Sequence, residues 1–288
     1  MPEAPKPHQG LPPLREVIAR HNLSARRGLG QHFLLDLNLT ARIARAAGDL
    51  EGVTVIEVGP GPGGLTRALL ATDVRAVIAI ERDARCVAAL GELGDAHPGR
   101  LRIIQADALG LDAAAVAASL GAEGPLKIVA NLPYNIATAL LLKWLGQADA
   151  FQSLTLTFQK EVAERLTAPC RSKRYGRLSV MTQWLCEARV MFDIPPRAFV
   201  PRPKVTSTVV TLIPYATPAA EASMKDLELL TRAAFGQRRK MLRTSLKTLN
   251  ADPRALLGAA GISPTARAEE LDVGAFCALA RAYAALRA

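Results

Sequence analysis

The side chains best suited to chemistry stand in the run Asn131-Leu132-Pro133-Tyr134, directly after the apolar residues 128–130. The Asn131 side-chain oxygen and the Leu132 carbonyl can both accept hydrogen bonds from an exocyclic amino group such as adenine N6. Pro133 has a fixed φ that stiffens the turn, and Tyr134 offers a flat ring on which an unstacked base can lie. Asn and Pro are also common in ordinary turns, so these four residues alone leave both interpretations open.

A glycine-rich segment, residues 57–64, precedes this turn in the chain and follows an earlier apolar run. Glycines there let a ligand approach the backbone closely, and Gly59, Gly61 and Gly64 fit the GxGxxG pattern of dinucleotide-binding loops. Glu81 follows about twenty residues later, where an acidic side chain can bind ribose hydroxyls. The pattern alone does not separate S-adenosylmethionine from NAD, so an NAD-dependent oxidoreductase is one alternative.

Short apolar runs alternate with helical patterns through the first half of the chain. Such runs indicate strands buried on both faces, and hence an α/β fold with a mostly parallel, doubly wound sheet. We expect strands at residues 53–58, 76–81, 101–106, 127–130, 153–158 and 207–213. We expect helices between them at residues 65–71, 84–93 and 112–120.

Polar side chains follow successive strands of this predicted sheet. Asp107 ends the third strand, where a carboxylate can accept a hydrogen bond from an adenine amino group, and Asn131 ends the fourth. An open α/β sheet binds its ligand at the carboxyl ends of its strands. Each carboxylate taken singly is equally well explained as a helix N-cap.

The pattern after Pro214 changes to helices only. We expect these helices at residues 225–235, 238–249, 253–260 and 273–286. The sequence therefore predicts a disordered N-terminal tail over residues 1–13, a Rossmann-like domain over residues 14–214 and a small helical domain over residues 215–288.

The positive charge of the chain is concentrated in residues 160–250, which contain 17 Lys and Arg against 7 Asp and Glu. This surplus equals the whole net charge of +10. It suggests a surface that meets a polyanion, with a solvated basic face as the alternative. If residues 238–249 are helical, one stripe carries Arg239, Arg243 and Lys247, flanked by Arg238 and Lys240. A separate loop carries Arg171, Lys173, Arg174 and Arg177 around Tyr175.

The four cysteines are widely spaced, with no CxxC pair and no His at metal-ligand spacing. We therefore expect reduced thiols and no metal. No apolar stretch approaches 18 residues and the N-terminus has no signal-peptide pattern, so we expect a cytoplasmic protein without a membrane partner.

The motifs stand in the order found in a known family. The segment Gly30-Gln31-His32-Phe33-Leu34 is followed by EVGPGPGGLT, Glu81, QADA and NLPYNIAT, and then by YGRLSV, FVPRPKV and QRRK. With these motifs, the chain from about Ala25 to its C-terminus resembles the ribosomal RNA adenine N6,N6-dimethyltransferases, and within them the kasugamycin-sensitivity type.

The resemblance implies a Rossmann-like class I methyltransferase fold and S-adenosylmethionine as methyl donor. The family's cofactor contacts correspond to His32, Leu34, Gly59, Gly61, Glu81, Asp107 and Asn131. Its base-positioning residues correspond to Asn131, Leu132, Pro133 and Tyr134, with Phe199 a weaker candidate for the opposite face of the base. The family often has Asn where this chain has His32, so a contact there could come from backbone or from the ring.

The resemblance also implies a substrate, namely two adjacent adenosines in a hairpin loop near the 3′ end of 16S rRNA. The partner would be an immature 30S ribosomal subunit, met by a monomeric enzyme with Arg238, Arg239, Lys240, Arg243 and Lys247 on the RNA. Two alternatives remain open at this point. One is a 23S rRNA adenine N6-methyltransferase of the macrolide-resistance type, and the other a non-catalytic RNA-binding assembly factor.

Overall fold

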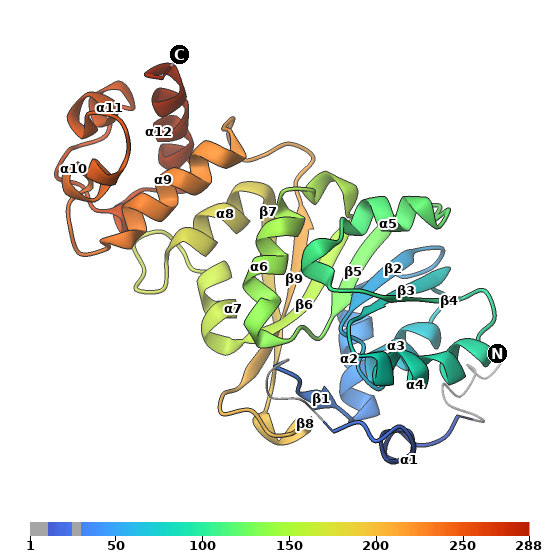
Figure 1. Ribbon diagram of the computed structural model, residues 1–288. Helices are drawn as coiled ribbons and strands as arrows, with labels where there is room; N and C mark the ends of the chain where they lie inside the picture. The colour runs from blue at the N-terminus through green and yellow to red at the C-terminus, as the bar shows by residue number, and fades with distance from the viewer. Residues whose placement is uncertain (1–10, 25–29, 288) are drawn as a thin grey trace. The chain divides into compact units, whose positions relative to one another are not determined.

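The computed structural model describes residues 11–24 and 30–287, which divide into two compact units (Figure 1). The first unit contains the residues up to Lys160 together with Arg189–Ile213. The second contains Glu161–Ala188 and the chain from Pro214 onward, so it includes a segment that the sequence assigned to the first. The predicted tail over residues 1–13 lies, as far as residue 10, outside the described residues.

A seven-stranded sheet forms the centre of the first unit, in the order β4-β3-β2-β5-β6-β9-β7. The pairs from β4 across to β6 are parallel, and β9 is antiparallel to β6. The predicted α/β fold with a mostly parallel sheet is thus confirmed. The strands are β2 (Thr54–Val58), β3 (Ala76–Glu81), β4 (Leu101–Gln105), β5 (Leu126–Ala130), β6 (Ser153–Gln159), β7 (Cys186–Ile194) and β9 (Ser207–Pro214).

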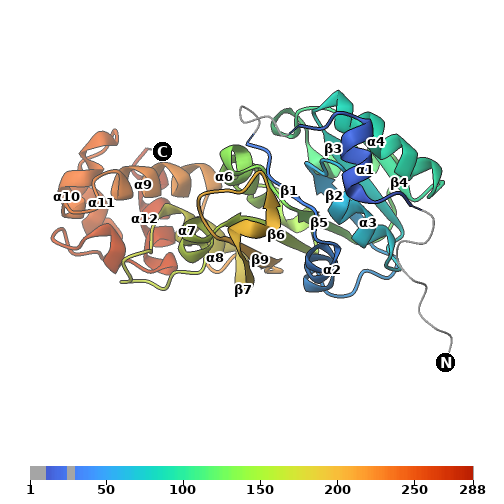
Figure 2. The same cartoon turned by 90° about the horizontal axis from the view of Figure 1, so that it is seen from below.

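Helices cover both faces of this sheet, because the chain runs outward from β2 to β4 and then returns through β5 to β6. Right-handed crossovers place the helices of the two directions on opposite faces. Figure 1 accordingly shows α3 and α4 on one side and α5 and α6 on the other, and Figure 2 shows α3 and α4 beside β2 to β4. Their bounds are α3 (Gly64–Leu70), α4 (Ala84–Asp95), α5 (Ala113–Ser119) and α6 (Tyr134–Leu145).

The inner strands are buried on both faces. All five residues of β2 are buried, although Thr54 and Glu57 are polar. Val55 and Leu69 belong to one apolar cluster, which also includes Ile43 of helix α2 (Leu37–Ala46) and Phe199. This layer fixes the carboxyl ends of the strands, which is where the sequence places its candidate ligand residues.

A second, two-stranded sheet pairs β1 (Phe33–Leu34) with β8 (Phe199–Val200) in antiparallel fashion. The sequence analysis did not predict it, since two residues are too few to show a period. Strand β1 contacts both α2 and α3. Helix α1 (Leu14–Arg20) precedes it, and short 3₁₀ helices occur at Ala108–Gly110 (η2), Ala148–Ala150 (η3), Pro196–Ala198 (η4), Leu246–Thr248 (η5) and Ala268–Glu270 (η6).

The second unit is helical in its described residues, apart from the first residues of β7 and the bridge at Met241. Helix α9 packs against both α8 and α12, and the ring of Phe235 on α9 lies 5.5 Å from that of Phe276 on α12. The helices are α7 (Lys160–Leu166), α8 (Arg177–Leu185), α9 (Met224–Gly236), α10 (Leu242–Ser245), α11 (Pro253–Ala259) and α12 (Val273–Ala285).

The predicted helix at residues 238–249 is confirmed only over residues 242–248, as α10 followed by η5. Residues 237–240 form a turn and a bend, Met241 makes an isolated β-bridge with Arg267, and α10 spans only four residues. The backbone N–H groups of Leu242 and Arg243 donate to carbonyls of residues 266 and 264, so a distant segment takes the bonds that a helix would need. The three cations of the expected stripe therefore do not share one helix face.

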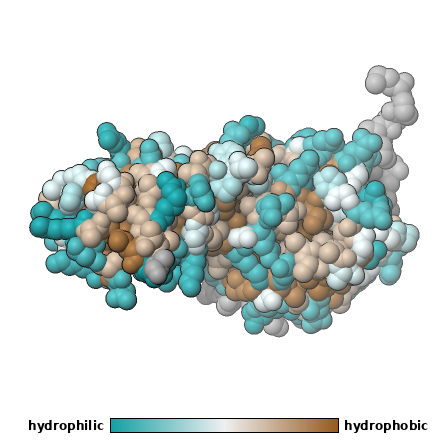
Figure 3. All heavy atoms as spheres, turned by 90° about the horizontal axis from the view of Figure 1, so that it is seen from above, coloured by the Kyte–Doolittle hydropathy of each residue, from teal (hydrophilic) through white to brown (hydrophobic). Residues whose placement is uncertain are grey.

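The surface is mixed in polarity. On the face seen in Figure 3, hydrophilic residues separate small hydrophobic patches. No helix among the residues that the structure describes is both long and apolar enough to cross a membrane.

Gly64 supports a prediction about packing between α3 and β1. A Cβ at Gly64 would lie 2.7 Å from the Leu34 backbone oxygen, whereas a Cβ at Gly91 of α4 would meet nothing within 4 Å. We expect Gly64→Ala to destabilise the fold by about 1–3 kcal/mol, as overpacking does. The matched Gly91→Ala should be neutral or stabilise by up to about 1 kcal/mol. Urea unfolding checks both, and equal effects of the two changes would contradict the close approach.

Candidate functional site

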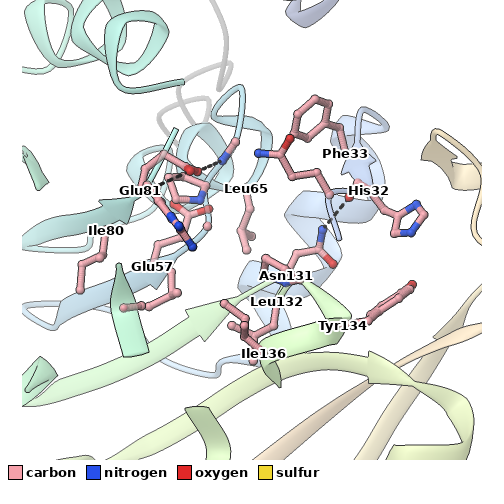
Figure 4. A pocket seen from close by; sticks show the side chains of 18 of the residues that line it. His32, Phe33, Glu57, Leu65, Ile80, Glu81, Asn131, Leu132, Tyr134 and Ile136 are labelled. Carbon is pink, nitrogen blue, oxygen red and sulfur yellow. Dashed lines mark hydrogen bonds between the residues drawn. The ribbon is translucent and has the colours of Figure 1, made fainter. Parts of the chain in front are cut away.

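A pocket opens at the carboxyl ends of strands β2 to β5. It encloses about 1100 Å³ when the open solvent at its mouth is included. Of the eleven residues that the sequence predicted for cofactor and base, all except Phe199 line it: His32, Leu34, Gly59, Gly61, Glu81, Asp107, Asn131, Leu132, Pro133 and Tyr134. Figure 4 shows Glu57 and Glu81 on one side of the pocket, His32 and Tyr134 on the other, and Asn131 between them.

The glycine-rich loop that follows β2 forms part of the wall. Gly59 has φ +69°, a left-handed conformation that favours glycine, and its N–H donates to the Ile80 carbonyl of β3. A Cβ at Gly59 would lie 3.3 Å from Pro133 Cδ. The loop and the Asn131–Tyr134 turn are therefore in direct contact, and the wall they form there is backbone and a proline ring.

Glu81, the last residue of β3, is held by three backbone N–H groups. Its Oε1 accepts from Arg82 and Asp83, each at 2.8 Å, and its Oε2 accepts from Gly61 at 3.1 Å. Burial raises the pKa of this carboxyl, while the backbone hydrogen bonds oppose the rise. Each carboxylate oxygen has two lone-pair directions, so Glu81 can still accept hydrogen bonds from a ligand.

Glu57 was not predicted as a site residue, yet it lines the same pocket and is only 1 % exposed. Its Oε2 has no hydrogen-bond partner among the described residues. Burial raises the pKa of Glu57 to about 8, and the nearby charge of Glu81 adds to the rise. The signal in the sequence is that Glu57 is the one charged residue in the otherwise apolar and hydroxyl-bearing run 53–58.

Asp107 both caps a helix and lines the pocket, so the N-cap and ligand-contact interpretations of this carboxylate are compatible. Its Oδ1 accepts from the Leu109 N–H at 3.0 Å and so caps η2, as an N-cap would. Its Oδ2 pairs with the Arg82 guanidinium at 3.1 Å, and the same side chain lines the pocket.

Asn131 has a fixed amide orientation. Its Nδ2 donates to the backbone carbonyl of His32 at 3.3 Å, which directs Oδ1 away from that bond (Figure 4). Neither this oxygen nor the Leu132 carbonyl accepts a hydrogen bond from the described residues. Two acceptors thus stand beside each other at the end of β5 without a protein partner.

His32 contributes differently through its backbone and its ring. The backbone carbonyl orients Asn131, whereas ring Nδ1 donates to the Pro201 carbonyl at 2.7 Å. The ring also lies 5.2 Å from that of Tyr134, at an interplanar angle of 33°. The imidazole is therefore turned toward Tyr134 and Pro201.

Tyr134 begins α6 and is anchored at its far end. A hydrogen bond of 2.5 Å joins its hydroxyl to Ser207 Oγ, and burial raises the pKa of the phenol. These contacts span 73 residues in sequence, so no local pattern could predict them. Phe199 is 2 % exposed and lies in the apolar cluster of the first unit, so its side chain is a core residue.

The basic residues predicted for RNA lie in the second unit and differ in environment. Arg238 pairs with Glu269 at 2.8 Å and donates to the Ser172 carbonyl, so it is bound within its own unit. Arg239, Lys240 and Lys247 are exposed, and Arg243 is half-buried. In the separate loop Tyr175 is buried, while Arg174 and Arg177 form ion pairs with glutamates.

No group of three His, Cys, Asp or Glu side chains in the described part of the chain could hold a metal ion. The four cysteines form no disulfide.

Comparison with known proteins places this site in a family. The model described as "Ribosomal RNA adenine dimethylase" matches residues 22–285. A protein named "Ribosomal RNA small subunit methyltransferase A" from Paramagnetospirillum magneticum is 65 % identical over 272 residues, which cover 94 % of this chain and 95 % of the relative. A protein of the same name from Rhodospirillum rubrum is 60 % identical, over 97 % and 95 % of the two chains.

Two solved structures share the fold. A dimethyladenosine transferase from Plasmodium falciparum superposes with a TM-score of 0.70 at 23 % identity, covering 83 % of this chain and 93 % of that one. The 23S rRNA methyltransferase ErmE superposes with a TM-score of 0.63 at 28 % identity, covering 87 % and 98 %. The class I methyltransferase fold is thus shown on two independent structures.

Glu57 gives a prediction for stability against pH. Between about pH 4.5 and about 8 the native protein keeps a proton on Glu57 that the unfolded chain releases. The raised pKa therefore costs stability as pH rises, by roughly 1 kcal/mol per pH unit across this window. Glu57→Gln removes this cost, so its advantage over the parent should grow from pH 5 to pH 8 and then level off.

The measurement is urea unfolding at several pH values without added ligand. Glu51→Gln, at an exposed position, is the matched control and should show no such trend. A constant difference between Glu57→Gln and the parent across the window would show that Glu57 is ionised in the native state.

Proposed function

This chain belongs to the ribosomal RNA adenine dimethylase family, and we propose that it transfers methyl groups from S-adenosylmethionine to N6 of two adjacent adenosines of 16S rRNA. The observation that carries the proposal is the pair of unpartnered acceptors, Asn131 Oδ1 and the Leu132 carbonyl, at the end of β5. They lie beside an anchored aromatic ring, in the pocket that Glu81 and Asp107 also line.

The groups that line the pocket fit the proposed methyl donor. Glu81 Oε2 has one lone pair left to accept from a ribose hydroxyl, and Asp107 can accept from an adenine amino group. The orphaned Oε2 of Glu57 suits the ammonium end of the donor, whose charge would also stabilise the ionised carboxyl. When bound, S-adenosylmethionine supplies a methyl group already activated by a positively charged sulfur.

The protein's part in the reaction is then to position the target amino group. Asn131 Oδ1 and the Leu132 carbonyl accept hydrogen bonds from the N6 amino group. These bonds aim the nitrogen lone pair at the donor. Tyr134 stacks on the base, and its bond to Ser207 fixes the plane of the ring. The N6 proton becomes acidic once a methyl group is attached, so no side chain needs to act as a strong base.

The small-subunit substrate is favoured over the large-subunit alternative. Relatives named for the small subunit are about 60 % identical to this chain, while the 23S rRNA methyltransferase ErmE is 28 % identical. We infer that the target is a hairpin loop near the 3′ end of 16S rRNA in an immature 30S subunit, and that the reaction takes place in the cytoplasm.

The second unit is proposed to contribute RNA contacts through Arg239, Lys240, Arg243 and Lys247. Arg238 would support them from its ion pair with Glu269. As the family resemblance implies, we infer that the enzyme acts as a monomer.

The purified protein should transfer label from S-adenosylmethionine to immature small subunits and yield N6,N6-dimethyladenosine. The measurement is nucleoside analysis of the labelled rRNA after digestion. Label found only in naked 23S rRNA would instead support the large-subunit alternative, and no label in either RNA would support a non-catalytic factor.

We expect Asn131→Ala to lower turnover by at least about 100-fold, because it removes an acceptor that positions N6 in the transition state. Cofactor affinity, measured by calorimetry, should fall much less. Asn38→Ala, an exposed change on α2, is the control and should leave methylation unchanged. Near-normal methylation by Asn131→Ala would exclude the proposed role.

A further inference from the structure

The segment from Val200 to Thr206, here called the 200–206 loop, is tied to the pocket at three places. Its first residue pairs with Phe33 of β1. The Pro201 carbonyl accepts from the ring of His32 at 2.7 Å. Immediately after the loop, Ser207 bonds the Tyr134 hydroxyl. The loop is therefore held by the same side chains that surround the proposed base position, although none of its residues lines the pocket.

The loop presents two cations to solvent. Arg202 and Lys204 are exposed, and neither makes a hydrogen bond or ion pair with the described residues. The loop contains no acidic residue, and Asp193, close to it through Thr208, is already paired with Lys160. Its positive charge is thus not neutralised within the first unit.

The loop is also stiff and partly apolar. Pro201 and Pro203 each fix one φ, and the Thr206 carbonyl accepts from the Lys160 N–H. Val200 and Val205 are 54 % and 43 % exposed. Two cations on a stiff support, flanked by exposed apolar side chains, suit a strand of nucleic acid, whose phosphates alternate with sugars and bases.

The geometry of base flipping explains why such cations would stand here. A base that stacks on Tyr134 brings its own ribose and the two adjoining phosphates to the rim of the pocket. Those phosphates are the nearest anions available to a loop that is bonded to His32 and Tyr134.

We propose that Arg202 and Lys204 bind the RNA phosphates next to the target adenosine, an inference that rests on the proposed function. This surface belongs to the first unit and is separate from the basic residues 238–247 of the second. It would hold the nucleotide in register while Asn131 and Tyr134 position the base. Its loss should therefore affect RNA binding more than the methyl-transfer step.

The test compares two double variants that remove the same charge. Arg202→Gln/Lys204→Gln changes the loop, and Arg15→Gln/Arg45→Gln changes two exposed cations outside the pocket and the loop, at the start of α1 and the end of α2. The probes are immature small subunits and the naked 16S 3′-terminal hairpin, with binding measured from 50 to 200 mM salt. Thermal unfolding and cofactor affinity show whether each variant remains folded.

For the loop variant we expect the KM for subunits to rise about tenfold. The slope of log Kd against log salt should fall by about 1.5, because each lost phosphate contact removes about 0.7–0.9 from the slope. The kcat and cofactor affinity should stay near those of the parent. The control variant should match the parent in KM, salt slope, kcat and cofactor affinity.

Three outcomes would overturn the inference. Equal losses in both double variants would mean a general effect of charge. Unchanged binding of both probes by the loop variant would mean that the loop meets no RNA. Weaker binding to subunits with unchanged binding to the hairpin would mean that the loop faces a ribosomal protein. Failure of the parent itself to methylate small subunits would contradict the proposed function, a result distinct from these three.

Discussion

The hydrogen bond from Asn131 Nδ2 to the His32 carbonyl is the contact on which the arrangement of the site depends. A neutral hydrogen bond of this kind contributes only about 1 kcal/mol to stability. Its consequence is geometric, because it fixes which end of the amide meets the pocket. That bond requires β1 to lie beside the end of β5, and β1 is held there by its pairing with β8 and by its close approach to Gly64.

The opposite side of the pocket is organised by buried carboxyl groups. Glu81 draws the glycine-rich loop and the start of α4 together, because it accepts from Gly61 on one side and from Arg82 and Asp83 on the other. Glu57 lies nearby with an oxygen that no described residue satisfies. Two buried acids in one pocket destabilise the empty protein, and this cost is what a cationic nucleoside ligand would relieve.

The basic residues form two groups that composition does not distinguish, namely those in ion pairs within the protein and those exposed without such partners. Several are internal, since Arg174, Arg177 and Arg238 are paired with glutamates of the second unit. Others are exposed without such partners, among them Arg202 and Lys204 in the first unit. A cation already paired has little to gain from RNA, so the exposed ones are the better measure of where a polyanion can bind.

The sequence by itself determined the parallel sheet, because near-continuous apolar runs can be buried only between two layers of helices. It also determined many residues of the pocket, since His32, Glu81, Asp107 and Asn131 lie in motifs recognisable from local order, but it missed Glu57. The tertiary structure alone decided the β1–β8 pair, the bond between Tyr134 and Ser207 and the burial of Phe199. It also prevented a continuous helix over residues 238–249, because the N–H groups of Leu242 and Arg243 donate to the carbonyls of residues 266 and 264. These features join residues far apart in the chain, and a local pattern carries no information about such partners.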